Sequence, residues 1–131
     1  MKRPLLACAA GALALALLAG CAQQPGAPTG VMDLAQRPAE KALLAGMRAY
    51  DDGQYGEAER LFNSALGTGL ASAKDKAAAH KYLAFIYCTS ERTSQCEAAF
   101  KAARAADPAF ALTKSEAGHP MWGPVYRRAS Q

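Results

Sequence analysis

The side chains best suited to chemistry in this sequence are its four cysteines and two histidines. Cys88 and Cys96 are separated by seven residues, whereas a redox-active pair typically has two residues between its cysteines. His80 could join this pair, but three ligands without the usual spacing make a poor zinc site. The sequence shows no nucleophile elbow, phosphate-binding loop or paired carboxylate motif. We therefore expect neither an enzyme nor a bound metal ion or cofactor.

The start of the chain indicates export. Two basic residues precede an apolar run that reaches residue 20, which is the pattern of a secretory signal peptide. The run ends in Leu18-Ala19-Gly20-Cys21, which resembles the lipobox of bacterial lipoproteins. This resemblance implies that residues 1–20 are removed and that Cys21 is acylated. The alternative is an uncleaved transmembrane anchor, because the run is close to the lower length limit of a spanning helix.

Export assigns a role to each cysteine. Cys8 leaves with the signal peptide, and Cys21 is the predicted lipidation site. Cys88 and Cys96 remain as an even pair in an oxidising compartment, which predicts a disulfide between them. Closing such a short loop would stabilise the fold by roughly 2–3 kcal/mol. The alternative is two buried free thiols that act as small apolar side chains.

Residues 21–37 are expected to form a lipidated, flexible tether, because proline, glycine and glutamine dominate this segment. Ala22 and Gln23 follow the lipidation site, where an aspartate would signal inner-membrane retention in bacterial lipoproteins. By that resemblance we expect an outer-membrane anchor with the domain facing the periplasm. Loss of the signal lowers the net charge from +4 to +2, which argues against nucleic-acid binding.

Residues 38–131 are predicted to form one all-α domain. Small and apolar residues recur at helical spacing, and no sustained alternating strand pattern is present. The predicted helices cover Pro38–Asp51, Tyr55–Leu66, about Lys76–Cys88 and about Ser94–Ala106. The turns between them contain the Asp, Gly and Ser residues that such connections favour.

The residue order within these helices resembles the tetratricopeptide repeat. The second copy contains, in order, His80, Leu83-Ala84, Tyr87, Cys96, Phe100 and Asp107-Pro108. The first copy contains Ala45-Gly46, Ala58 and Phe62, but lacks the bulky opening residue and the closing proline. Phe62 and Phe100 lie 38 residues apart instead of the usual 34. The resemblance implies about two tetratricopeptide-like helical hairpins, and a generic helical bundle is the alternative.

The C-terminal segment is predicted to cover the second hairpin. Trp122, Val125 and Tyr126 have helical spacing and could form a short C-terminal capping helix. Alternatively, Trp122 is an exposed anchor for a partner, because tryptophan is common at binding hot spots. His119 precedes Pro120, and we expect it to cap this final helix.

Several features together resemble the TssQ-type lipoproteins associated with bacterial type VI secretion systems. These features are the lipoprotein signal, the tether, the paired cysteines and the segment Gly-His-Pro-Met-Trp-Gly-Pro-Val-Tyr at residues 118–126. The resemblance covers about residues 42–127. It implies a non-enzymatic accessory protein of the cell envelope that binds protein components of the secretion machine. The alternative is a small tetratricopeptide lipoprotein that assists pilus-secretin or outer-membrane assembly. A cell-wall enzyme, the third hypothesis, would need an acid–base pair that the sequence does not show.

A pair of tetratricopeptide hairpins would form its concave face mainly from the first helix of each pair. On this basis we predict that Arg48, His80 and Lys81 contact a segment of a partner protein. No small-molecule substrate is expected.

Overall fold

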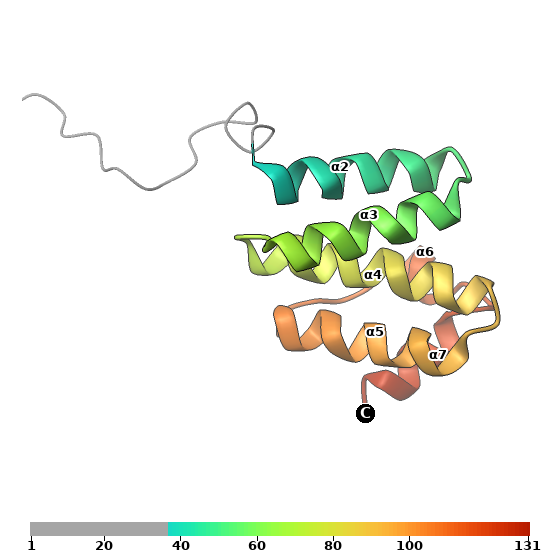
Figure 1. Cartoon of the computed structure of the whole chain (residues 1–131). Helices are drawn as coiled ribbons and strands as arrows, with labels where there is room; N and C mark the ends of the chain where they lie inside the picture. The colour runs from blue at the N-terminus through green and yellow to red at the C-terminus, as the bar shows by residue number, and fades with distance from the viewer. Residues whose placement is uncertain (1–36) are drawn as a thin grey trace, which may run out of the picture.

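The computed structural model describes residues 37–131, so Cys21, the predicted signal peptide and most of the predicted tether lie outside the described residues. The described part contains six helices and no strand. Figure 1 shows two long hairpins followed by two short helices. The helices are α2 (Pro38–Asp51), α3 (Tyr55–Thr68), α4 (Ala73–Thr89), α5 (Thr93–Ala106), α6 (Lys114–Ala117) and α7 (Gly123–Ala129). The predicted all-α fold of helical hairpins with a short C-terminal helix is confirmed.

The helix ends follow local capping chemistry. Helix α2 has the predicted bounds, with Pro38 in its first turn. Helix α4 begins before the predicted Lys76, because the Ser72 hydroxyl accepts the Asp75 N–H at 3.3 Å and caps the helix at that point. Helix α3 continues to Thr68, and Gly69 ends it with a φ of 104°. The connection between the two hairpins is therefore shorter than the predicted polar loop.

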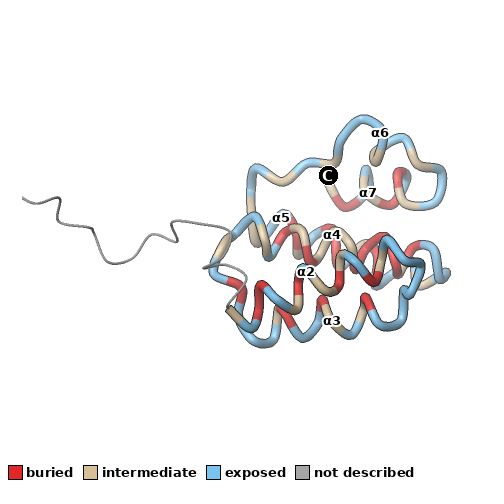
Figure 2. The backbone as a smooth tube through the Cα atoms, turned by 90° about the horizontal axis from the view of Figure 1, so that it is seen from above, coloured by how far each residue is buried: buried red, intermediate tan, exposed pale blue. Residues whose placement is uncertain are grey.

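The two hairpins pack through small residues and two phenylalanines. Phe62 and Phe100 are fully buried, as are Ala58, Ala84 and Cys96 around them. A Cβ atom added to Gly46 would lie 2.8 Å from Cε1 of Phe62, so helices α2 and α3 approach too closely here for any larger residue. Figure 2 shows the buried positions turned towards the neighbouring helices along both hairpins. The small and aromatic residues that carry the repeat resemblance therefore form the core.

A row of ring contacts links the first hairpin to the C-terminal segment. Tyr82 stacks on Phe62 with 5.1 Å between ring centroids, and it also meets Tyr50 and Phe85 edge-on. Phe85 continues the row to Phe100 of α5 and to the C-terminal segment. Aromatic pairs in these geometries contribute roughly 0.5–1.5 kcal/mol each beyond their burial. The row therefore joins all three parts of the fold.

The C-terminal segment lies against the second hairpin. The Trp122 ring stacks on Phe85 with centroids 4.2 Å apart, and its indole N–H donates to the Glu116 carbonyl at 2.7 Å. Val125 is buried, and the Tyr126 ring meets the Phe100 ring edge-on with 5.2 Å between their centroids. These contacts support the capping interpretation, with Trp122 packed against the hairpin.

The expectation for His119 is corrected. Helix α7 begins at Gly123, and its N-cap position is Trp122. The Nδ1 atom of His119 instead accepts the Met121 N–H at 3.2 Å, within the preceding turn. Its ring stacks on Trp122 with 3.4 Å between centroids. His119 therefore holds the tryptophan in place and caps the turn before the helix.

Candidate protein-binding surface

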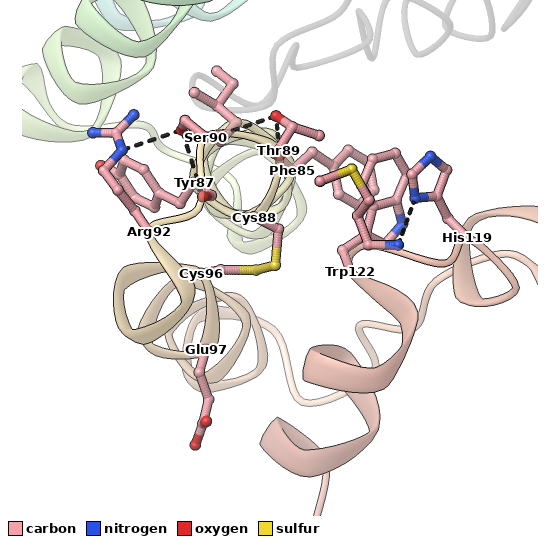
Figure 3. Close-up of a disulfide and its surroundings, with 12 residues drawn as sticks. Phe85, Tyr87, Cys88, Thr89, Ser90, Arg92, Cys96, Glu97, His119 and Trp122 are labelled. Carbon is pink, nitrogen blue, oxygen red and sulfur yellow. Dashed lines mark hydrogen bonds between the residues drawn. A yellow bond between two sulfur atoms is a disulfide. The ribbon is translucent and has the colours of Figure 1, made fainter.

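A disulfide fixes the geometry of the second hairpin. Cys88 is the last buried residue of α4, and Cys96 lies in the first turn of α5. The structure joins the two sulfurs in the predicted pairing, with Cα atoms 5.2 Å apart (Figure 3). Cys96 is fully buried and Cys88 nearly so. The bridge thus locks the turn between α4 and α5 from inside the core.

Lys81 lies beneath the C-terminal segment. Its Nζ atom is 2.7 Å from Oε1 of Glu116, and only 22% of the lysine side chain is exposed. Burial acts to raise the Glu116 pKa, but hydrogen bonds from Lys81 and Thr113 outweigh it and hold the pKa below its usual value. The ion pair ties α6 to α4. The structure therefore does not present Lys81 as an exposed contact.

His80 lies on a different side of α4. It is half-buried and lines an open hollow of about 280 Å³, together with residues of α3 and α5 such as Leu66 and Ala99. Burial lowers the His80 pKa, so its neutral form is favoured. This hollow is mostly apolar, and its position between α3 and α5 separates it from the face that carries Lys81.

Arg48 lies on the outer side of α2. It is exposed, as are Lys41 and Leu44 on the same strip of the helix, and 38% of Leu44 is accessible. We call Lys41, Leu44 and Arg48 the outer face of α2. The three predicted contacts Arg48, His80 and Lys81 are therefore not brought together on one exposed groove.

The spacing between the two repeat copies identifies the residues of α4 that correspond to the outer face of α2. Shifting by the 38 residues that separate Phe62 from Phe100 maps Lys41, Leu44 and Arg48 onto α4. The corresponding α4 residues are Ala79, Tyr82 and Ile86. Ala79 and Ile86 are buried, and Tyr82 packs against Tyr50 and Phe62 of the first hairpin. The outer face of α2 thus corresponds to the face of α4 that packs against the preceding hairpin.

Two further observations bear on chemistry. Within residues 37–131, no group of three His, Cys, Asp or Glu side chains could hold a metal ion. The half-buried ion pair between Arg92 and Glu59, with 2.7 Å between Nη2 and Oε2, joins the turn after α4 to α3. The Arg92 guanidinium also lies over the Tyr87 ring at 4.5 Å. These groups are engaged in packing the hairpins together.

No protein-family profile matches the chain, and comparisons with curated proteins and solved structures find no match either. Among the helices of residues 37–131, none combines the length and apolar character needed to cross a membrane.

Two features that position the C-terminal segment were not predicted from the sequence. Thr113 and Glu116 form a capping box that starts α6, and the Thr-x-x-Glu spacing is a recognisable signal for it. Phe85 was not assigned to a packed face, although it is 4% exposed and carries Trp122. No sequence signal identifies Glu116 as the partner of Lys81, because their pairing depends on how the C-terminal segment folds back.

Proposed function

We propose that this chain is a lipid-anchored adaptor that holds a protein component of a type VI secretion system at the periplasmic side of the outer membrane. The outer face of α2 is the observation that carries the proposal. Its register equivalents on α4 are packed against a neighbouring hairpin, whereas Leu44 and Arg48 are exposed. A partner helix that lies on this face would extend the stack in the same way as α4 extends the first hairpin.

The composition of the face indicates the kind of partner it accepts. Leu44 supplies an apolar centre, and Lys41 and Arg48 lie one turn to either side. A complementary segment is an amphipathic helix with an apolar stripe and acidic residues along its edge. Affinity would come from the desolvated leucine, while the two cations would set orientation and association rate.

The predicted anchor supports the same function. Sixteen residues, Ala22 to Arg37, separate Cys21 from the first helix. A coil of this length spans roughly 20–25 Å, which would keep the domain close to the membrane. The Cys88–Cys96 bridge is of the kind found in exported proteins. The resemblance to TssQ-type lipoproteins supplies the identity of the proposed machine.

Co-purification from crosslinked envelopes tests the adaptor function. We expect the wild type to recover a component of the secretion machine, and Leu44→Asp or Arg48→Glu to recover several-fold less. Lys114→Glu is the matched control, because Lys114 is also exposed but lies on α6. Recovery of pilus-secretin or outer-membrane assembly proteins would favour the alternative machine. Equal recovery by all variants would contradict a binding role for the outer face.

A separate experiment tests the anchor. Cys21→Ser should abolish acylation and leave an uncleaved or mislocalised precursor. Mass spectrometry of the wild type should show acyl chains on Cys21, and an unmodified mature Cys21 would contradict the proposed attachment.

A further inference from the structure

The charged side chains divide between the two ends of the hairpin stack. The end at which the chain enters α2 also contains the start of α4 and the ends of α3 and α5 (Figure 1). We call the terminal helical turns and connections there the tether end. The opposite turns, around the connections from α2 to α3 and from α4 to α5, form the far end. A hydrogen bond from the Ala71 N–H to Glu40 Oε1 holds the α4 connection against the start of α2.

Every exposed charged side chain of the tether end is basic. These residues are Lys41, Lys74, Lys76 and Arg104. The acidic residues of this end do not balance them at the surface, because Glu40 is buried and Asp75 and Asp107 are half-buried. Arg104 also donates a hydrogen bond to the Ser130 carbonyl, which leaves the three lysines as its most available cations.

The far end has the opposite character. Its exposed charged residues are Asp51, Asp52, Glu57 and Glu91, with Arg48 as the one exposed base among them. With the half-buried Arg37 included, the tether end has five basic and three acidic residues and a net charge of +2. With the half-buried Arg92 included, the far end has two basic and four acidic residues and a net charge of −2. The domain is therefore polarised along its helix axes, although its helices run in alternating directions and their dipoles largely cancel.

We infer that the tether end is a docking surface for anionic phospholipid. This inference rests on the proposed anchor at Cys21, which places this end closest to the bilayer because sixteen residues join Cys21 to it. Lysines near an anionic bilayer are attracted over about one Debye length, roughly 10 Å at 0.1 M salt. The acidic far end would be repelled. The domain would stand on its tether end, with the far end and the length of α2 directed into the periplasm.

Lysine acylation on membrane-bound protein tests this orientation. The full mature protein is reconstituted on phosphatidylcholine vesicles with or without phosphatidylglycerol, and each modified lysine is quantified by mass spectrometry. With phosphatidylglycerol, the reactivity of Lys41, Lys74 and Lys76 should fall by at least about threefold and recover in about 1 M salt. Lys114 is exposed on α6, outside the tether end, and is the internal control whose reactivity should not change.

A charge-reversal pair completes the test. Lys74→Glu/Lys76→Glu should remove the protection of Lys41, and acidic residues in the first turn of α4 are compatible with the helix dipole. The matched variant Lys114→Glu/Arg127→Glu makes the same change in charge on the C-terminal segment and should retain the protection. Equal reactivity of the three lysines on both kinds of vesicle would overturn the inference.

The same samples separate this inference from the proposed anchor. If the mass of the mature N-terminus shows no acyl chain, the anchor is wrong. Protection of the three lysines by added anionic vesicles would then still support the docking surface, and its absence would overturn that surface as well.

Discussion

Replacing Trp122 by alanine should destabilise the whole described domain. The indole is half-buried, stacks on Phe85 at 4.2 Å and on His119 at 3.4 Å, and donates a hydrogen bond to the Glu116 carbonyl. Truncating a fully buried tryptophan costs about 3–5 kcal/mol. Allowing for the exposed part of the ring, we expect Trp122→Ala to lower the free energy of unfolding by about 2–4 kcal/mol. This is a large fraction of the roughly 5–15 kcal/mol typical of such domains.

The assay is reversible urea unfolding of the oxidised protein, followed by far-ultraviolet circular dichroism. Circular dichroism is needed because Trp122 is the only tryptophan, and the variant loses its fluorescence signal. In the wild type, fluorescence and circular dichroism should report the same transition, because the indole lies on the core of the second hairpin. The melting temperature of the variant should fall by at least about 10 °C.

Met121→Ala is the matched control for this prediction. Met121 adjoins Trp122 in the chain, but 47% of it is exposed. Its replacement should change the free energy of unfolding by no more than about 0.5 kcal/mol. The capping role would be refuted if Trp122→Ala were as stable as Met121→Ala, or if the wild-type fluorescence transition preceded the loss of helix.

Four further variants probe the packing of the hairpins and the ion pair beneath the C-terminal segment. Cys88→Ala/Cys96→Ala should lose about 2.5 kcal/mol in urea unfolding, and an unchanged midpoint would argue against a bridge in the native protein. Gly46→Ala should lower the free energy of unfolding by about 1–2 kcal/mol, because the added Cβ would clash with the Phe62 ring. Gly67→Ala should raise the free energy of unfolding by up to about 1 kcal/mol, because Gly67 is helical and its Cβ would meet open space. Glu116→Gln should be less stable than the wild type near neutral pH. Because the folded-state pKa of this carboxyl is lowered, its stabilisation is present above the unfolded pKa and lost as pH falls through the folded pKa, so the two melting temperatures should converge in acid.

The four long helices could be predicted because their signals are local. Pro38 marks the start of α2, and the spacing of Ala58 and Phe62 identifies the packed face of α3. The cysteine pair was predictable from its short separation together with the signs of export. The predicted start of α4 was late because the capping role of Ser72 was overlooked in a stretch of small polar residues.

The surface could be predicted only in part, because it depends on contacts between distant segments. Arg48 was correctly expected to be exposed, but Lys81 is covered by α6 and pairs with Glu116, which lies 35 residues further along the chain. His80 occupies a packing position of the repeat, yet the phase of α4 turns it towards α3 and α5. An error of one or two residues in helix phase moves a side chain to another face, so sequence periodicity alone could not assemble one contact surface.

Site-specific photo-crosslinking at position 44 tests the central claim most directly. A benzophenone amino acid replaces Leu44 at the centre of the outer face of α2, or Asn63 on the exposed side of α3 as a control. Irradiated cells should give one major adduct from position 44, whose partner is a component of the type VI secretion machine, and little or none from position 63. No adduct at position 44, or the same set of adducts from both positions, would contradict the adaptor account.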